Sequence, residues 1–465
     1  MSKPERENDL KANKPNVILI VLDSVRADHL SCYGYPRPTT PNIDRVAEAG
    51  TLYERAYAAS CWTLPSHASL FTGLYPSRHR TDFDTQALTE GIDTCASFLS
   101  KRGYRTASFS CNAFVGEHTD LTRGFDRVED VEGLKGGRGS FLGKVVRGLH
   151  RLFRRAFARD RGAQRAWSLT RSWLGEQREE PFFLFLNFMD CHLPYRLAAK
   201  DLLHFVEPGR RREVSQLPMD PFAAMAGERQ YDAAQIEDLK AMYDGALRYL
   251  DGYIGRIDDE LERLGLKDDT LLLITSDHGE SFGEHGLFDH QYGLYEPLIQ
   301  VPLVARGPGV AASRREQGLV QLVDIFPSIA GEVDGSEPVG DRWSSSSIFD
   351  GPDRDFIAAE YLVPNLRLFH RRFPDTDTSR FDTALRAIRD ERYKCIVRRD
   401  GRTELYDLET DPAEVRNLYE SDPDRAVRMT QLLEERLGPW PADIGADGGA
   451  SLDPLRDRLE QLGYL

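Results

Sequence analysis

The chain has 465 residues, of which 40% are apolar, so it can bury a large core as one big domain with a smaller one, or as several ordinary domains. Acidic residues outnumber basic ones, 75 against 60, and the net charge of −15 argues against nonspecific binding of nucleic acid over the whole surface. We therefore expect a globular protein with no nucleic-acid partner.

The N-terminal stretch and the cysteines favour a cytoplasmic protein. The first sixteen residues are polar, and the apolar run "VILIVL" that follows is too short for a signal peptide or a membrane span. The six cysteines are scattered and form no Cys-x-x-Cys pair, which is typical of reduced thiols. We expect neither secretion nor membrane spanning.

In chain order, four short apolar runs predict strands. Each run contains β-branched or aromatic residues and ends at a polar residue. The runs are "NVILIVLD" from residue 16, "RTASFSCN" from 105, "PFFLFLNFMD" from 181 and "TLLLITSD" from 270. Helix-length segments such as "PNIDRVAEAG" and "DLKAMYDGALRYLDGYIGRIDDELERLG" separate them. Continuous apolar runs that alternate with helices are typical of buried strands in a largely parallel sheet. The pattern therefore predicts an α/β domain.

Polar side chains follow these strands, at the edge where such a sheet binds ligands. They come from four separate runs: Asp23, Asn112, Asp190 with His192, and Asp277 with His278. Any one of them could simply cap a helix or form a turn. Four strand ends that deliver polar groups to one edge favour a functional site.

Residues 143–174 break the acidic pattern. Apolar side chains recur there at helical spacing, and a lysine and many arginines fill much of the remaining surface. A basic amphipathic helix can lie on an anionic membrane or bind an acidic partner. A solvated helix packed on the core is the other interpretation, so peripheral membrane contact through 143–174 stays open.

The sequence pattern of the C-terminal third predicts a smaller structural unit. Residues 332–355 are rich in Gly, Ser, Pro and Asp, which indicates a linker or surface loop. Residues 386–420 predict two strands joined at "RDGR" and then a helix. We predict a catalytic domain over 15–335, a small α+β subdomain over 355–425 and a helical tail over 426–465.

The strand ends and one helix start together suggest metal-assisted chemistry. Asp23, Asp277 and His278 combine hard oxygen ligands with a borderline nitrogen ligand, and could hold one divalent cation such as Zn, Mn, Mg or Ca. Pro65 favours the first turn of a helix, which places Thr63 at or just before a helix N-terminus that suits a sulfate or phosphate group. A cation would make the Thr63 hydroxyl a better nucleophile. The alternative role of Thr63 is a helix N-cap.

Most of the chain resembles the sulfatase family within the alkaline-phosphatase superfamily. The matching segments occur in family order from residue 16 to about 420: "NVILIVLDSVRADHLSCYGYPRPTTPNIDRVAEAGTLYERAYA", "TLPSHASLFTGLYPSRH", "FLFLNFMDCHLPY", "TSDHGESFGEHGLFDH", "LYEPLIQVPLVARGPG" and "RYKCIVRRDGRTELYDLETDPAEVRNL". The resemblance implies a large mixed, mostly parallel sheet flanked by helices, with a smaller C-terminal α+β lobe. It is far less specific for the substrate.

The chain departs from this family at the nucleophile. Sulfatases normally carry Cys-x-Pro-Ser-Arg, whose cysteine is oxidised to formylglycine, and the matching position here is Thr63, with Pro65 and Ser66 in register. Cys61 lies out of register, and a threonine cannot become formylglycine, so none is expected. His67 stands at the position of the motif's arginine.

The family's sulfate-binding lysines are also absent. Their positions fall near Cys111 and His290, so the cationic clamp is missing or replaced by histidines. Asp23 is followed by Ser24 instead of a second aspartate, which weakens a calcium site and fits a transition metal better.

The resemblance implies a role for each candidate residue. A single divalent metal ion is expected on Asp23, Thr63, Asp277 and His278. The expected catalytic residues are Thr63, His67 and His192, the last as a proton donor or a ligand of a substrate oxygen. The expected substrate-binding residues are Asn112, His285 and His290, of which the two histidines could instead bind a second cation. For each histidine, a purely structural role is the alternative.

These observations predict a metal-dependent hydrolase of small-molecule or glycan sulfate or phosphate/phosphonate esters, with Thr63 as the nucleophile. Two other functions stay open. A membrane-surface transferase that moves a phosphoryl-alcohol group onto a glycan or lipid would suit the basic segment. An inactive ester- or glycan-binding homologue would suit the lost cysteine and arginine, although the retained metal ligands argue against it. The oligomeric state stays undetermined.

Overall fold

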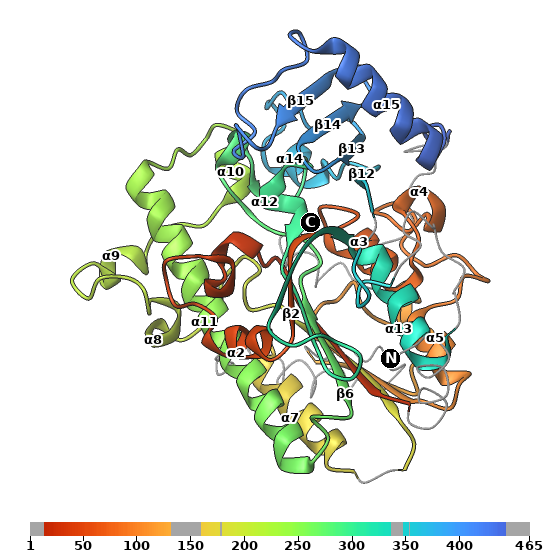
Figure 1. The fold of residues 1–465 in the computed structure, drawn as a ribbon. Coiled ribbons are helices and arrows are strands. Elements are labelled where there is room, and N and C mark those ends of the chain that lie inside the picture. Colours follow the sequence, from red (N-terminus) through yellow and green to blue (C-terminus); the bar gives the residue numbers. More distant parts are fainter. Residues whose placement is uncertain (1–13, 132–159, 177–178, 336–346, 353, 443–465) are drawn as a thin grey trace, which may run out of the picture.

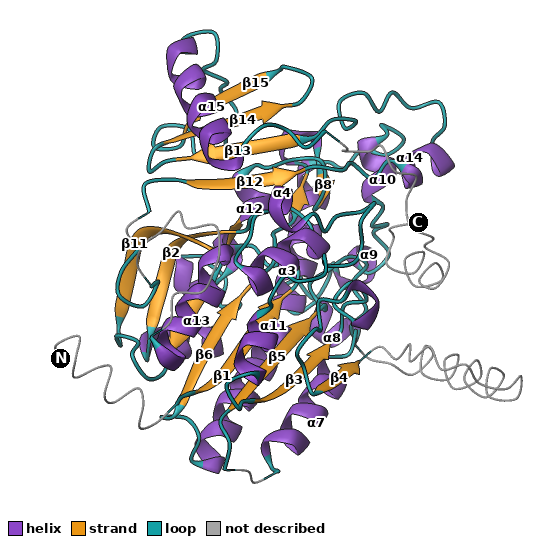
Figure 2. Ribbon diagram, turned by 90° about the vertical axis from the view of Figure 1, so that its right-hand side faces the viewer, coloured by secondary structure: helices purple, strands orange, loops and turns teal. Residues whose placement is uncertain are grey.

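The computed structural model describes residues 14–131, 160–176, 179–335, 347–352 and 354–442, which form two packed units (Figures 1 and 2). The larger unit is built on a nine-stranded sheet, and the smaller on a four-stranded sheet. The smaller unit, blue in Figure 1, lies across one end of the larger one.

The four apolar runs form the centre of the large sheet. They are β1 (Asn16–Leu22), β3 (Arg105–Ser110), β5 (Phe182–Phe188) and β6 (Thr270–Thr275). These strands lie in the order β6-β1-β5-β3 and run parallel. Val17 to Leu22 are all buried, because helices cover both faces of the sheet. The predicted strands and their parallel pairing are confirmed.

Five further strands extend this block on both sides. They are β2 (Thr51–Tyr57), β4 (Arg127–Asp130), β9 (Gln300–Val301), β10 (Leu303–Arg306) and β11 (Arg314–Gln321). β4 continues the parallel set beside β3, whereas β10 runs antiparallel between β6 and β2, and β11 pairs parallel with β2. The sheet is therefore mixed and mostly parallel, which confirms the predicted fold class.

Helices lie on both faces of this sheet (Figure 1). One layer contains α2 (Pro41–Glu48), α7 (Ala163–Leu174), α8 (Ala199–Leu202) and α11 (Ala233–Leu264). The other contains α3 (Thr63–Thr72), α5 (Cys95–Ser100) and α13 (Ile325–Asp334), with α4 (Pro76–His79) beside α3. The short helices α9 (Arg211–Val214), α10 (Pro221–Met225), α12 (Glu296–Ile299) and α14 (Arg367–Arg372) lie in connections.

The long helix α11 has clear local start and stop signals. Asp232 accepts a hydrogen bond from the Gln235 amide at 2.8 Å, and the Gln235 side chain accepts from the Asp232 amide. Gly265 ends the helix in the left-handed region, at φ 67°. Its buried face packs against α2, α7 and α8.

The small unit is an antiparallel sheet with one long helix. Its strands are β12 (Ile357–Tyr361), β13 (Leu385–Arg389), β14 (Tyr393–Arg398) and β15 (Thr403–Asp407). The helix is α15 (Pro423–Leu437), which packs on β13, β14 and β15. The two predicted strands joined at "RDGR" are β14 and β15, and the helix begins beyond residue 420.

Parts of three predicted segments lie outside the residues that the structure describes. Within the basic segment 143–174, residues 143–159 lie outside the described residues, and the remainder is mainly α7, which packs on α11, β3 and β5. Residues 336–346, between the predicted domains, and 443–465 of the predicted tail also lie outside the described residues. Among the described helices, none has both the length and the apolar character to span a bilayer.

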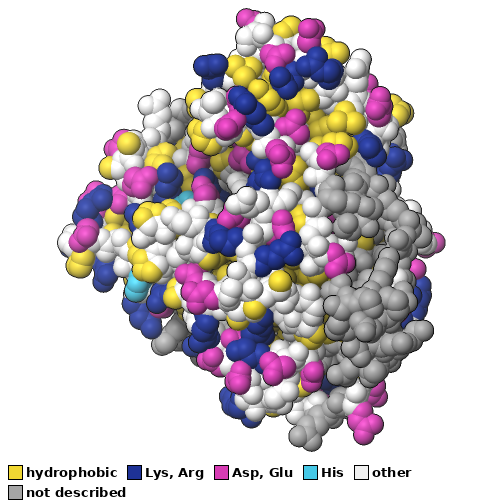
Figure 3. Space-filling model, viewed as in Figure 1, with side chains coloured by type: hydrophobic (Ala, Val, Ile, Leu, Met, Phe, Trp, Pro, Cys, Tyr) yellow, Lys and Arg dark blue, Asp and Glu magenta, His cyan; other side chains and the backbone are white. Residues whose placement is uncertain are grey.

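The structure also shows the state of the cysteines and the distribution of charge on one face. All six cysteines are free thiols. On the face shown in Figure 3, basic and acidic side chains are interspersed.

Candidate active site

Side chains from the ends of the central strands meet at one edge of the sheet. Asp23 follows β1, Asn112 follows β3, and Asp277 and His278 follow β6. The ligand atoms of Asp23, Asp277 and His278, called here the carboxylate cluster, all lie within 4.8 Å of one another and are buried. The convergence expected from a shared carboxyl edge is present.

Thr63 reaches this cluster from the start of α3. Its Oγ1 lies 3.3 Å from His278 Nε2 and 3.4 Å from Asn112 Nδ2, and its side chain is fully buried. The N-cap of α3 is Trp62, whose side chain makes no capping bond, so Thr63 is the first helical residue. The alternative role of Thr63 as an N-cap is therefore not what the structure shows.

The carboxylate cluster fits a divalent cation. His278 Nδ1 donates to the Gly279 carbonyl oxygen at 2.9 Å, which leaves the Nε2 lone pair facing Asp277 Oδ2 at 3.3 Å and Asp23 Oδ1 at 3.9 Å. Asp277 Oδ2 is buried and has no hydrogen-bond partner among the described residues. Two carboxylates, an imidazole and a hydroxyl form a donor set suited to Zn²⁺ or Mn²⁺.

The protonation of the cluster reflects two carboxyls buried side by side. Burial and the adjacent Asp23 charge raise the pKa of Asp277 well above its ordinary value. Burial also opposes ionisation of Asp23, but the imidazoles of His192, His278 and His67, with Asn112, lower its pKa to about 2. Burial lowers the pKa of His278 well below its ordinary value, so its imidazole is neutral. A cation between the two carboxyls would allow both to ionise.

Asn112 and Ser24 orient these groups. Asn112 Nδ2 donates to Asp23 Oδ2 at 2.7 Å. Ser24 has a positive φ of 62°, its amide donates to Asp277 Oδ1 at 3.3 Å, and its hydroxyl donates to Asp23 Oδ1 at 3.1 Å. The serine that replaces the family's second aspartate therefore bridges the two carboxylates.

His67 lies directly behind Thr63 and contacts its backbone. Its Nδ1 donates to the Thr63 carbonyl oxygen at 2.9 Å and is 3.4 Å from Asp277 Oδ2. Its ring is fully buried against Phe71 and Phe185, and burial lowers its pKa. The position matching the family's arginine thus holds a neutral side chain that contacts the backbone and Asp277.

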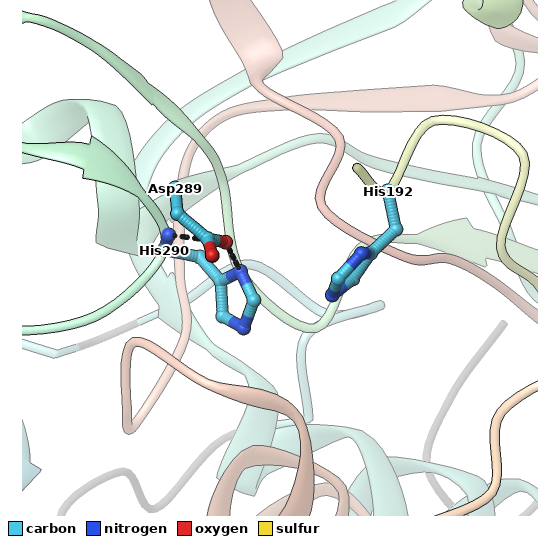
Figure 4. Close-up of side chains that lie close together, drawn as sticks. All are labelled: His192, Asp289 and His290. Atoms are coloured by element: carbon cyan, nitrogen blue, oxygen red, sulfur yellow. Dashed lines mark hydrogen bonds and ion pairs between the residues drawn. The ribbon is translucent and has the colours of Figure 1, made fainter. Parts of the chain in front are cut away.

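A second group of ligands adjoins the first. The ligand atoms of His192, Asp289 and His290, called here the histidine cluster, also lie within 4.8 Å of one another and are buried. His290 stacks on His278, with ring centroids 4.4 Å apart and planes at 14°. Figure 4 shows the His192 ring turned toward His290, which pairs with the Asp289 carboxylate. Burial and His290 lower the pKa of His192 to about 4.

His285 is oriented differently from His290. It stacks on Tyr295 with ring centroids 3.6 Å apart, and the charges that act on it come from Glu404, Lys394 and Glu284. None of its described contacts reaches either cluster, so the structure does not bring it together with the other candidates.

Sequence reasoning missed three polar residues at this edge. Asp289 lies on β8 (Phe288–Asp289), which pairs with β7 (Ser281–Phe282), and its only sequence signal was its position next to His290. Glu280 is fully buried near Asp289 and Asp23. Asn187 at the end of β5 donates to His67 Nε2 at 3.5 Å, and its polarity within an apolar run could have singled it out.

The fold and this edge define an α/β enzyme with a candidate metal-and-hydroxyl site. Residues 15–335 match the family model described as Sulfatase, and residues 283–439 match the model described as N-sulphoglucosamine sulphohydrolase, C-terminal. The chain belongs to the sulfatase family. This membership confirms the predicted class, a sulfatase-like ester hydrolase.

Individual known proteins agree with this assignment. The chain is 24% identical to the N-acetylgalactosamine-6-O-sulfatase of Bacteroides thetaiotaomicron, over 93% of this chain and 95% of that protein. Its fold is similar to the phosphonate monoester hydrolase of Agrobacterium radiobacter, with TM-score 0.65, 22% identity and coverage of 93% and 97%. It is also similar to a structure solved with D-glucosamine-2-N,6-O-disulfate, with TM-score 0.68, 20% identity and coverage of 91% and 97%.

Proposed function

We propose that this protein hydrolyses sulfate or phosphate/phosphonate esters of small molecules or glycans, with Thr63 as the nucleophile. The observation that carries the proposal is the position of Thr63 Oγ1, 3.3 Å from His278 Nε2 at the edge of the buried carboxylate cluster. Relatives that act on a sugar sulfate and a fold neighbour that is a phosphonate monoester hydrolase support this range of substrates.

The roles of the residues follow from their contacts. Asp23, Asp277 and His278 would hold one divalent cation, which when bound would lower the pKa of the adjacent hydroxyl and neutralise charge on the transferred group. Thr63 Oγ1, after loss of its proton to solvent, attacks the sulfur or phosphorus atom. The bond from that atom to the ester oxygen breaks, the alcohol leaves with a proton from water, and a second water cleaves the Thr63 ester.

Neighbouring groups fix this arrangement. Asn112 donates to both Asp23 and the Thr63 hydroxyl, which sets the direction of the nucleophile. His67 holds the Thr63 carbonyl and lies beside Asp277. Because these side chains are at most 2% exposed, their electrostatic interactions act with little screening by water.

A nearby cavity suits the leaving group. The sequence segment 363–383 lines part of a cavity of about 400 Å³, together with Phe83, Asp84 and Arg399. The Phe83 ring lies 6.0 Å from that of Trp62, the residue before Thr63, and the Tyr292 hydroxyl donates to the Asn365 carbonyl at 2.5 Å. The cavity carries both acidic and basic side chains, which suits a polar alcohol such as a sugar.

The test is a substrate panel with matched variants. Aryl sulfate, phosphate monoester, phosphate diester and phosphonate monoester substrates are assayed with the metal-loaded protein, Thr63→Ala and Thr63→Ser. We expect turnover of at least one class, a loss on the order of 10⁴-fold or more in kcat for Thr63→Ala, and activity within about tenfold for Thr63→Ser. A Thr63→Ala protein that matches the original on every substrate would show that Thr63 is not the nucleophile.

A further inference from the structure

We propose that the histidine cluster binds a second divalent cation, beside the cation expected in the carboxylate cluster. His192 lies in the loop that follows β5, Asp289 lies on β8, and His290 is the residue after β8. These positions are about a hundred residues apart in the chain, yet the three ligand atoms lie within 4.8 Å of one another in a buried setting. One ion can therefore contact all three.

The two imidazoles are oriented as ligands. His192 Nδ1 donates to the Leu193 carbonyl oxygen at 2.5 Å, so in this tautomer the ring lone pair is on Nε2. The ring centroids of His192 and His290 are 4.8 Å apart at 65°, so the rings converge without stacking (Figure 4). The Asp289 carboxylate pairs with the His290 ring, which places an oxygen ligand directly beside that imidazole.

A second observation is a buried carboxyl group without hydrogen-bond partners next to this cluster. Both carboxylate oxygens of Glu280 are buried and have no hydrogen-bond partner among the described residues. Asp289 and Asp23 are among the charges that act on Glu280. Arg26 also acts on it, but the Arg26 guanidinium pairs with the side chains of Asp28 and Glu284 and reaches only the Glu280 carbonyl.

The number of buried carboxyl groups at this edge of the large sheet favours binding of more than one cation. Within the described part of the chain, no lysine or arginine forms an ion pair with Asp23, Asp277, Glu280 or Asp289. Four carboxyls that are buried without a lysine or arginine partner cannot all ionise at low cost unless metal ions neutralise them. One divalent ion balances two of these charges, and a second ion balances the others.

The ligand set indicates which cation would bind. Two imidazoles and one carboxylate favour zinc or a similar transition ion, and three protein ligands leave a coordination position open toward a substrate oxygen. His290 stands where sulfatases are expected to carry a sulfate-binding lysine. A cation held there would bring a positive charge to the transferred group in place of that ammonium group.

The experiment measures metal content, so it does not depend on Thr63 being the nucleophile. The chelator-stripped protein is titrated with Zn²⁺ alone, and bound zinc is measured by mass spectrometry after gel filtration. We expect about two equivalents for the original protein. We expect about one for His290→Asn and one for Asp23→Asn, each of which removes a ligand of one cluster.

The controls separate a lost site from a damaged fold. His204→Asn, at an exposed histidine, should retain both equivalents, and circular dichroism should confirm that each variant is folded. Anomalous diffraction from zinc-loaded crystals of the original protein provides a second measurement without any substitution. Two peaks, one of them between His192 and His290, support the proposal. A single peak at the carboxylate cluster, or saturation at one equivalent, overturns it even if the Thr63 assignment holds.

Discussion

Asn112 is the side chain that joins Thr63 to the carboxylate cluster. Its Nδ2 donates to Asp23 at 2.7 Å and lies 3.4 Å from Thr63 Oγ1, in a position that is 2% exposed. Asn112→Ala should lower kcat by on the order of 10²-fold, since a preorganised donor at the reacting group is lost. Steady-state kinetics on the best substrate of the panel measure this.

The Asn112 prediction needs a check on folding. The Asn112→Ala protein should melt at a lower temperature than the original but still cooperatively, because Asn112 also accepts a hydrogen bond from the Phe114 amide at 2.8 Å. If kcat is unchanged while the variant is folded, Asn112 does not direct Thr63.

His79 is a buried residue that makes stability depend on pH. Its Nδ1 accepts from the Thr81 amide at 3.0 Å, its Nε2 lies 3.1 Å from Ser69 Oγ, and burial lowers its pKa to about 3. Because the unfolded chain binds this proton more readily than the folded one, His79 contributes stability above about pH 6.5 that is lost as the pH falls toward 3. We expect His79→Gln to have a flatter dependence of unfolding free energy on pH than the original protein.

Urea unfolding at several pH values between 4 and 8 measures this difference. The comparison of the two proteins isolates His79 from other titrating groups, since both share them. Parallel curves for His79→Gln and the original protein would mean that protonation of His79 does not matter for folding.

At the level of elements, the loop after β6 is held by a glycine. A Cβ on Gly279 would lie 2.0 Å from the Pro297 carbonyl oxygen, and the Gly279 amide donates to the Leu298 carbonyl at 2.8 Å. Gly279→Ala must therefore push this loop away from α12 and move His278, whose Nδ1 bonds to the Gly279 carbonyl. We expect at least about a tenfold loss in affinity for the cation of the carboxylate cluster.

A second glycine provides the matched control. Gly252 lies within α11, and a Cβ there would meet nothing within 4 Å. Gly252→Ala should keep the metal affinity and raise the free energy of unfolding by up to about 1 kcal/mol. Calorimetric titration with Zn²⁺ and thermal melts compare the two variants, and equal metal affinity in both would remove the argument for Gly279.

A comparison of the helices, strands and turns shows which features local sequence patterns can predict. The strands β1, β3, β5 and β6 were predicted because continuous apolar runs mark strands buried on both faces. The start of α3 at Thr63 followed from Pro65 in its first turn. By contrast, the direction of His285 was not predictable, because it has a φ of 54° within a tight turn. In such a turn neither strand alternation nor helical spacing tells where a side chain points.

At the level of the whole molecule, a buried lysine joins the two units. Lys394 on β14 is fully buried, and its Nζ lies 3.1 Å from Glu296 Oε1 and 2.8 Å from Glu414 Oε1. Glu296 belongs to α12 and also accepts from the Tyr57 hydroxyl of β2 at 3.0 Å. Lys394→Met should lower the free energy of unfolding by about 3–5 kcal/mol, because Glu414 would remain buried without its cation and Glu296 would keep only Arg389, 3.6 Å away.

An exposed pair on the same sheet is the control. Arg402→Met removes the contact of an arginine that is 60% exposed with Asp400, and should change stability by no more than about 0.5 kcal/mol. Urea denaturation followed by tryptophan fluorescence and circular dichroism measures both variants. A Lys394→Met protein as stable as Arg402→Met would show that this network does not hold the units together.

The sequence by itself determined the central strands, the polar residues at their carboxyl ends, the start of α3 at Thr63 and the sulfatase-like fold. The strands and the residues at their ends follow from local periodicity and from the rule that parallel strands bring their ends to one edge, whereas the sulfatase-like fold follows from the resemblance of the sequence motifs to that family. Only the tertiary structure decided that Asp289 joins His192 and His290, and that loops of both units enclose a cavity near Trp62. Such placements depend on contacts between distant segments and on single backbone angles, such as the φ of 69° at Asp289, which no local pattern encodes.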